Sequence, residues 1–250
     1  MGSKSSKLRN VLVVFQFTAS IVLIIGTFVV YQQMEFILNT KTGFQKEQVI
    51  QLMGTGIIRD QPDNFKNELL KIPQVESVTI GDYLPIAGTA RNGNTWWKDG
   101  RTKIDGGSNG QNWEIDYDYL ETLGMNLLEG RNFNKEMRTD SSAMIINQAM
   151  AKELGIADNP LGAKITNRSS NRLVWTVIGV VEDFNYDLLT EAIRPLALRL
   201  GSSPSTTSIK VNSQNMAATL GQIQSVWEEI APNQPFIYEF MDQSYAKMYA

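Results

Sequence analysis

An uninterrupted apolar segment near the N-terminus is the strongest pattern in the chain. Residues 11–31 read VLVVFQFTASIVLIIGTFVVY, in which 16 of 21 residues are apolar and none is charged. A helix of this length, rising about 1.5 Å per residue, extends about 31 Å, which matches the hydrocarbon core of a bilayer. A cleavable signal peptide is the competing interpretation, but the run is longer than an h-region and no small-x-small cleavage site follows it. The pattern therefore predicts a transmembrane helix over 11–31.

Charged residues around this segment predict its orientation. Lys4, Lys7 and Arg9 precede the span, so the positive-inside rule places residues 1–10 in the cytoplasm and the main part of the chain outside it. The bias is modest, because lysines also follow the span and MGSKSS resembles the remnant of an expression tag.

The helical pattern continues beyond the lipid and is interrupted twice within it. Residues 32–43 predict a stalk that Gly43 ends, because glycine is the usual residue just after a helix. A stiff stalk transmits displacement, which anchoring alone does not require. Gln16 and Gly26 either mark faces that pack against other membrane helices or are tolerated singly.

A β-α-β pattern follows the stalk. Residues 49–53 and 75–80 read as strands, and the segment between them places three apolar residues at helical spacing, namely Phe65, Leu69 and Ile72. Asp60 or Asp63 is the expected N-cap of that helix, and Pro73 ends it.

A second β-α-β pattern lies near the C-terminal end. Residues 207–211 and 236–240 read as strands around an amphipathic helix capped by Ser213 or Asn215. The apolar stripe of that helix consists of Met216, Leu220, Ile223, Trp227 and Ile230. Two such units in one sheet, with helices on one face, predict a split α/β sandwich over 44–83 and 201–241.

The intervening residues 84–200 have a different pattern and predict a second, inserted lobe. Residues 88–113 contain six glycines and predict hairpins and turns. A short helix is expected near 117–123, a strand at 143–146, a helix capped by Asn147 and ending at Leu154, and a strand at 173–181. The predicted fold class is therefore α+β, with one transmembrane helix and stalk followed by a two-lobed ectodomain.

The composition of the chain excludes most classes of catalytic site. The chain has no histidine and no cysteine, so it lacks Ser-His and Cys-His nucleophiles, zinc sites with those ligands, and disulfides. Its 26 acidic and 23 basic residues give a net charge of −3, which does not suggest nucleic-acid binding. No glycine-rich phosphate-binding motif occurs in a strand-to-helix context. We therefore expect no enzyme activity and no cofactor.

Two groups of carboxylates are the remaining candidates for chemistry. Glu114, Asp116 and Asp118 would share one face of a strand and could ligate a hard cation, although a solvated strand edge is the favoured interpretation. Glu182 and Asp183 follow an apolar strand, but adjacent strand residues point to opposite faces and cannot act on one bond. Asp183 is expected to cap the turn that follows it.

Trp96 and Trp97 are the candidate contact residues for a partner or substrate. Because they are adjacent in a predicted strand, one ring should be buried and the other partly exposed. Simple packing of a hairpin is the favoured alternative.

Four segments, in this order, resemble the family of MacB-like periplasmic core domains. The span and stalk, followed by Thr42-Gly43-Phe44, are similar to those of MacB/FtsX-type permeases. Residues 115–133 (IDYDYLETLGMNLLEGRNF), 143–165 (AMIINQAMAKELGIADNPLGAKI) and 177–195 (VIGVVEDFNYDLLTEAIRP) resemble three family blocks. Each motif alone is weakly specific, whereas their order is specific.

The resemblance implies an ABC-transporter permease that transmits force. It implies a cytoplasmic ATPase subunit that binds ATP, a second permease copy, the inner membrane, and a Porter-like lobe (44–83 and 201–241) with a Sabre-like lobe (84–200). Partners in the family include periplasmic adaptors, lipoproteins and cell-wall hydrolases, and no catalytic residue is carried over. Family permeases have further spans, so residues 242–250 are expected to begin a return stalk and the chain to be a fragment. The alternative is a membrane-anchored extracytoplasmic sensor or ligand-binding module.

Overall fold

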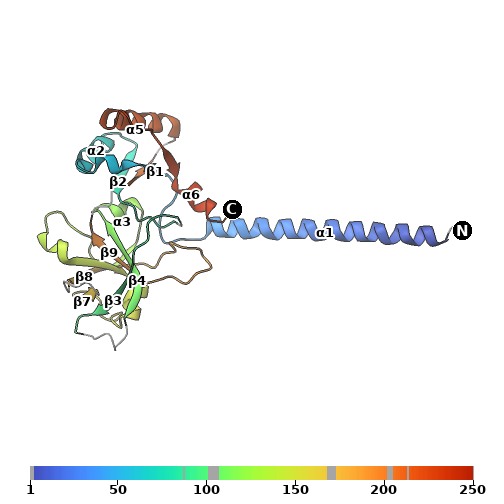
Figure 1. Cartoon of the computed structure of the whole chain (residues 1–250), viewed down its shortest axis with the longest axis horizontal. Helices are drawn as coiled ribbons and strands as arrows, with labels where there is room; N and C mark the ends of the chain where they lie inside the picture. Colours follow the sequence, from blue (N-terminus) through green and yellow to red (C-terminus); the bar gives the residue numbers. More distant parts are fainter. Residues whose placement is uncertain are drawn as a thin grey trace. The chain divides into compact units, whose positions relative to one another are not determined.

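The computed structural model describes residues 3–86, 88–100, 107–167, 173–201, 205–212 and 214–249. The chain divides into a unit formed by the N-terminal helix up to Lys41, and a unit that comprises Thr42–Met248. Each unit is described by itself (Figure 1).

The N-terminal unit is helix α1, Ser3–Asn39. Its stretch Arg9–Ile37 is long and apolar enough to cross a membrane. The hydroxyl groups of Thr18 and Thr27 donate to carbonyl oxygens four residues earlier, each at 2.8 Å, so these polar groups are satisfied inside the helix. The prediction that the stalk helix reaches residue 43 is wrong, because α1 ends at Asn39.

A four-stranded antiparallel sheet forms what we call the small lobe. Its strands are β1 (Val49–Met53), β2 (Val75–Ile80), β10 (Thr206–Val211) and β11 (Tyr238–Phe240). The order is β11-β1-β10-β2, so β10 separates the two strands of the first β-α-β unit. Its helical segments are η1 (Thr55–Ile58), α2 (Pro62–Leu69), α5 (Met216–Ile230) and α6 (Met241–Lys247). Helices α2 and α5 lie on the same face of the sheet (Figure 1).

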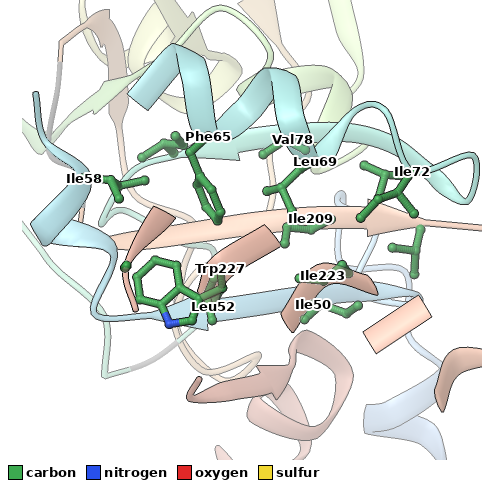
Figure 2. Close-up of a cluster of buried hydrophobic side chains, with 14 residues drawn as sticks. Ile50, Leu52, Ile58, Phe65, Leu69, Ile72, Val78, Ile209, Ile223 and Trp227 are labelled. Atoms are coloured by element: carbon green, nitrogen blue, oxygen red, sulfur yellow. The ribbon is translucent and has the colours of Figure 1, made fainter. Parts of the chain in front are cut away.

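The core of the small lobe fills the space between this sheet and those two helices. Ile50 and Leu52 point from β1 into the core, because alternate residues of a strand face the same side. Phe65 from α2 and Trp227 from α5 meet edge to face with ring centroids 5.7 Å apart (Figure 2). The indole N–H of Trp227 donates to the carbonyl oxygens of residues 234 and 235, so the largest side chain of this core has no unpaired polar group.

A seven-stranded mixed sheet forms the large lobe. Its strands are β3 (Gly93–Lys98), β4 (Ser108–Ile115), β5 (Leu127–Gly130), β6 (Ala143–Asn147), β7 (Lys164–Asn167), β8 (Val174–Val181) and β9 (Leu196–Leu200). The order is β5-β8-β6-β9-β4-β3-β7, and β7 pairs again with β8, so the sheet closes on itself. Its helical segments are α3 (Tyr119–Thr122), η3 (Arg138–Ser142) and α4 (Gln148–Glu153).

The helix caps show which local predictions hold. Asn147 caps α4 and Asn215 caps α5, each through a side-chain oxygen that accepts a backbone N–H, as expected; Ser213 lies outside the described residues. The expected cap of α2 by Asp60 or Asp63 is wrong. Gln61 occupies that position without a side-chain bond, and Pro62 follows it at the first helical position, where proline has no N–H to satisfy.

Three other boundaries differ from expectation. Strand β11 begins at Tyr238 instead of 236, and helix α3 begins at Tyr119 instead of 117. Residues 241–247 form α6, whose Met241 and Tyr245 are fully buried, so this segment packs into the ectodomain.

Substitution of Trp227 by alanine tests the assigned core. We expect the free energy of unfolding in detergent to fall by about 3–5 kcal/mol, because a fully buried indole is replaced by a cavity. Glu229→Ala on the exposed face of the same helix is the control, and its effect should stay within about 0.5 kcal/mol. Equal effects of the two substitutions would contradict the assignment.

Candidate functional site

Residues 42–46, which we call the entry segment, carry the chain from α1 into the ectodomain. The backbone N–H of Asn185 donates to the carbonyl oxygen of Thr42 at 3.1 Å, and the N–H of Gln45 donates to the carbonyl oxygen of Leu123 at 2.8 Å. The side chains of Thr42, Phe44 and Lys46 are buried. A loop-like stretch of sequence is therefore fixed by backbone bonds to two separate parts of the large lobe.

Gly43 lies so close to the large lobe that no other residue fits. Its φ is +84°, in the left-handed region that side chains with a Cβ disfavour. A Cβ there would lie 2.9 Å from the carbonyl oxygen of Asp183 and 2.7 Å from the Cβ of Phe184. Neither neighbour is the free end of a flexible side chain, so a side chain at position 43 would force backbone movement.

The same segment contacts helix α6. The ring of Phe44 lies edge-on to the ring of Tyr245, with centroids 6.2 Å apart. The Lys46 ammonium lies 5.1 Å from the centroid of the same Tyr245 ring, within the range of a cation–π contact. The entry segment thus contacts the large lobe through its backbone and α6 through its side chains.

Behind Gly43, an aromatic cluster extends into the large lobe. The Phe184 ring packs against Trp113 at 5.9 Å and Tyr186 at 5.9 Å, and Trp113 meets Tyr186 at 5.0 Å. Tyr83 stacks on Trp113 from the other side. Burial is the main cause that raises the pKa of the Tyr186 hydroxyl above its ordinary value, so the ring remains neutral.

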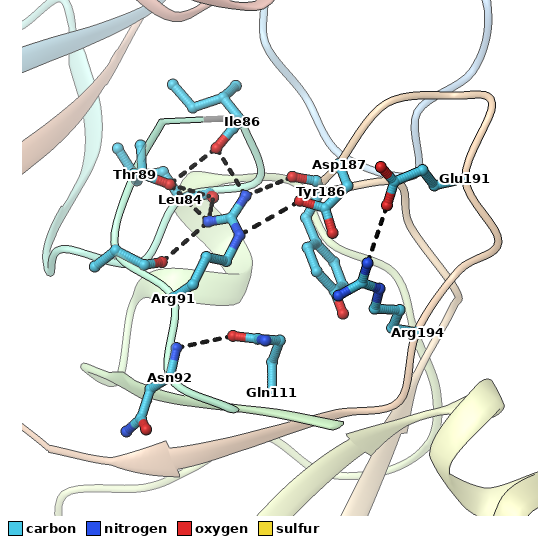
Figure 3. Close-up of polar contacts among 11 residues, drawn as sticks. Leu84, Ile86, Thr89, Arg91, Asn92, Gln111, Tyr186, Asp187, Glu191 and Arg194 are labelled. Carbon is cyan, nitrogen blue, oxygen red and sulfur yellow. Dashed lines mark hydrogen bonds and ion pairs between the residues drawn. The ribbon is translucent and has the colours of Figure 1, made fainter. Parts of the chain in front are cut away.

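Arg91 connects this aromatic cluster to the loop that follows β2 (Figure 3). Its guanidinium lies 5.4 Å from the Trp113 centroid and 5.3 Å from the Tyr186 centroid. It donates to four carbonyl oxygens across the two loops, those of Leu84 at 3.2 Å, Ile86 at 2.8 Å, Ala90 at 3.0 Å and Tyr186 at 2.5 Å. One rigid cation therefore holds the loop around residues 84–91 against residues 184–187, as the planar donor fork of arginine allows.

The two lobes are joined by a buried ion pair. The Lys66 ammonium of α2 lies 2.8 Å from a carboxylate oxygen of Asp116 and also contacts Asp118. Asp116 further accepts from the Thr79 hydroxyl at 2.6 Å and the Ile80 N–H at 3.1 Å, both in β2. Burial alone would lower the pKa of Lys66, but the two carboxylates outweigh it and raise that pKa.

A row of polar side chains crosses the small-lobe sheet on the face opposite α2 and α5. The register pairs Glu239 with Gln51, Gln51 with Ser208, and Ser208 with Thr79, so one residue from each strand contributes. Thr79 bonds to Asp116, and this polar row therefore runs from the lobe junction to β11. The Ser244 hydroxyl of α6 donates to Glu239 at 2.7 Å at the other end.

A cleft of about 580 Å³ opens beside this polar row. Its walls come from the sheet face, from α6 and from the loop that Arg91 holds. The residues that line it include Gln51, Met53, Asp82, Glu239, Lys247 and Met248. One of its walls is α6, which contacts the entry segment through Tyr245.

The residues proposed from sequence are not gathered at this cleft. Trp96 is fully buried in the core of the large lobe, where its ring meets Trp175 at 5.6 Å. Trp97 is half-buried, so only this ring is available for the predicted partner contact. Gln16 and Gly26 are exposed on α1, and their packing against other helices stays a prediction.

The acidic candidates have structural partners. Glu114 pairs with Arg199 at 3.3 Å, and Asp116 with Lys66, so the expectation of a solvated strand edge is wrong. Among the residues that the structure describes, no group of three or more acidic side chains is placed to hold a metal ion.

Asp183 does not cap the turn that follows it. Its carboxylate accepts from the Ala149 N–H at 3.0 Å and so caps α4, and burial raises its pKa.

Sequence reasoning missed Arg91, Lys66 and Gln51. Each is a single polar residue whose partners lie far along the chain, for example 50 residues between Lys66 and Asp116. For Gln51, alternation in the strand gives one usable signal, because an amide between two core residues must face the opposite side of the sheet.

Comparison with known proteins gives the family. The sequence family described as the MacB-like periplasmic core domain matches residues 13–226. The chain belongs to this family. No curated protein matches the chain.

Solved structures agree at the level of fold. The periplasmic region of MacB from Actinobacillus actinomycetemcomitans superposes with a TM-score of 0.56 at 15% identity, covering 83% of this chain and 94% of that one. The extracellular domain of the noncanonic ABC-type transporter YknZ from Gram-positive bacteria gives 0.51 at 17% identity, covering 76% and 98%. The chain is thus a MacB-like domain of an ABC transporter permease family, a transporter component with an N-terminal helix that suits membrane anchoring.

The family motifs of this MacB-like domain have structural roles. Arg131 makes a bidentate pair with the buried Asp140 at 2.8 and 2.7 Å, which lowers the pKa of that carboxyl. Asn147 accepts from the Met150 N–H and also from the Leu196 N–H at 2.9 Å. The Asp183-Phe184 pair forms the surface on which Gly43 rests. Motif residues therefore hold the large lobe and the entry segment in place.

Substitution of Gly43 by alanine tests the close approach. We expect the free energy of unfolding to fall by about 2–4 kcal/mol, because a left-handed alanine is strained and its Cβ also meets backbone atoms. Gly162→Ala is the matched control, since Gly162 has φ +78° but nothing within 4 Å of a Cβ, and should cost only about 1 kcal/mol. Equal losses would show that contact with Asp183 and Phe184 does not matter.

Substitution of Asp116 by asparagine tests the lobe junction. We expect the free energy of unfolding at neutral pH to fall by about 3 kcal/mol, because the buried Lys66 loses the less exposed of its two carboxylate partners. Asp63→Asn, at an 82% exposed side chain, is the control and should have little effect.

The same variant has a pH signature. The pKa of Lys66 is higher in the folded protein than its ordinary value of 10.5, so the charged lysine stabilises the fold fully below pH 10.5. This stability is lost as the pH rises through the pKa of the folded state. In Asp116→Asn, only Asp118 still opposes the effect of burial on the pKa of Lys66, so this pKa falls. The variant should therefore begin to lose stability at a lower pH than the parent does. An unchanged alkaline limb in denaturant titrations would contradict the assigned role of Asp116.

Proposed function

We propose that this chain is the extracytoplasmic domain and first span of an ABC transporter permease that couples cytoplasmic ATP hydrolysis to movement outside the membrane. The observation that carries the proposal is the entry segment. Directly after an apolar helix, the chain makes backbone bonds to the large lobe, a glycine contact that excludes any side chain, and a ring contact to α6. A simple tether needs none of these constraints, whereas transmission of displacement needs all of them.

Family membership supports the partners of this mechanism. An ABC permease acts with an ATPase subunit that binds ATP, and MacB-like permeases act as dimers. In this proposal the ATPase moves the span in the inner membrane, and the paired ectodomains respond in the periplasm. An adaptor, a lipoprotein or a cell-wall hydrolase would receive the movement. The half-buried Trp97 ring is the contact residue that we would test first on such a partner.

The division of the ectodomain supports the assignment of two family lobes. The four strands of the small lobe fall within 44–83 and 201–241, and the seven strands of the large lobe fall within 84–200. We assign the small lobe as Porter-like and the large lobe as Sabre-like.

Proline at position 33 tests transmission through the helix. Gln33 is exposed on α1, so Gln33→Pro interrupts the helix without removing a core contact. The chain has no native cysteine, so a spin label at Lys152→Cys on exposed α4 reports the distance between two permease copies. In the full permease with its ATPase subunit, we expect ATP to change that distance in the parent and in Gln33→Ala, but not in Gln33→Pro.

The controls separate transmission from assembly. The proline variant should still bind the ATPase subunit and retain the circular dichroism of the parent. An ATP-dependent distance change of normal size in Gln33→Pro would contradict the proposal. It would favour the alternative, a membrane-anchored sensor or ligand-binding module.

A further inference from the structure

The cleft beside the polar row has the size of a small-ligand site. Its volume of about 580 Å³ lies within the usual range for pockets that bind small molecules. Three separate segments form its walls: the sheet face, helix α6, and the loop after β2. The Arg91 guanidinium and the Thr89 hydroxyl both donate hydrogen bonds to the carbonyl oxygens of Leu84 and Ile86. These bonds keep the loop from collapsing into the cleft.

The floor of the cleft offers an unused hydrogen-bond donor. The Gln51 side chain lies in the sheet with only 1% of the residue exposed. Its Oε1 lies 3.3 Å from the Ser244 hydroxyl oxygen, whose proton goes to Glu239, whereas its Nε2 has no hydrogen-bond partner among the described residues. A buried donor without an acceptor is costly, so this position favours a ligand that supplies a neutral or anionic oxygen.

The charges around the cleft select against an anion. Asp82 and Glu239 line it, and Lys247 is the one basic side chain among its lining residues. The Lys247 contact lowers the pKa of Glu239, so this carboxylate stays ionised at neutral pH. Two carboxylates against one ammonium favour a cationic group and reject a carboxylate or phosphate.

The remaining walls are aliphatic. Met53 and Met248 line the cleft, together with Leu84 and Ile86. Flexible thioether side chains adapt to an unbranched hydrocarbon. The ligand therefore needs three features together: a neutral oxygen acceptor, a short aliphatic chain and a positive charge.

We propose that the cleft binds an aliphatic ammonium ion joined to a neutral carbonyl group, as in a basic aminoacyl amide. The carbonyl oxygen accepts from Gln51 Nε2, the aliphatic chain lies between Met53 and Met248, and the ammonium group lies beside Glu239 and Asp82. The inference concerns binding alone and holds whether or not the chain transmits force.

Three probes test this chemistry on the full chain in detergent. Nα-acetyl-lysinamide has all three features, Nα-acetyl-norleucinamide lacks the charge, and Nα-acetyl-lysine adds a carboxylate. Binding is followed by NMR of ¹³C-methyl-labelled methionines, in which Met53→Leu and Met248→Leu assign the two reporter signals. We expect saturable shifts of those two methyl groups with Nα-acetyl-lysinamide, and about tenfold weaker binding of the other two probes.

Two variants and a control complete the experiment. Glu239→Gln keeps a similar shape but removes a charge, so it should weaken binding of Nα-acetyl-lysinamide about fivefold and leave Nα-acetyl-norleucinamide unchanged. Gln51→Leu removes the donor and should weaken both probes. Glu136→Gln, an exposed position on the large lobe, should change neither. The methionine spectrum without ligand shows whether each variant folds.

The outcomes that overturn the proposal are specific. They are equal affinity for the charged and uncharged probes, unchanged affinity in Glu239→Gln, shifts confined to other methionines, or no saturable shift with Nα-acetyl-lysinamide.

Discussion

The contact between Gly43 and the Asp183-Phe184 backbone is the constraint on which the rest of the ectodomain depends. A Cβ at position 43 has no room, and the left-handed backbone there directs the chain from the end of the apolar helix into the body of the protein. Backbone bonds from Thr42 and Gln45 fix the segment on both sides of this contact. Atoms of the backbone, unlike long side chains, cannot yield by changing rotamer, so the entry segment is held against the large lobe although its sequence resembles a loop.

Two routes of direct contact lead away from this point. Through Phe184 the entry segment meets the aromatic cluster, and Arg91 extends that contact to the loop that forms one wall of the cleft. Through Phe44 it meets Tyr245 of α6, which forms another wall. The ion pair of Lys66 and Asp116 joins the two lobes at a separate point. One wall of the cleft, α6, therefore contacts the entry segment directly, and the loop after β2 is linked to it through Phe184, Trp113 and Arg91.

Periodicity predicted the parts of this fold that depend on local sequence. The apolar span, both β-α-β patterns and the caps at Asn147 and Asn215 follow from spacing and from the chemistry of single residues. The errors arose where a distant partner decides the outcome. Helix α1 ends at Asn39 and Thr42 accepts a bond from residue 185, whereas Asp183 accepts from the first turn of α4, 34 residues earlier in the chain, and not from its own turn. The roles of Gln51 and Arg91 depend on contacts among the sheet, α6 and the loop after β2. No pattern in a single sequence predicts such contacts.

Hydrogen exchange at the entry segment is the most direct measurement of the central claim, namely that this segment stays bonded to the large lobe. The amide hydrogens of Gln45 and Asn185 close the two backbone bonds that define the junction. In the full permease with its ATPase subunit, the account predicts that both amides stay protected during ATP turnover as they are at rest. Exchange of both amides at the rate of a free loop during turnover would show that the junction opens, and would contradict the account.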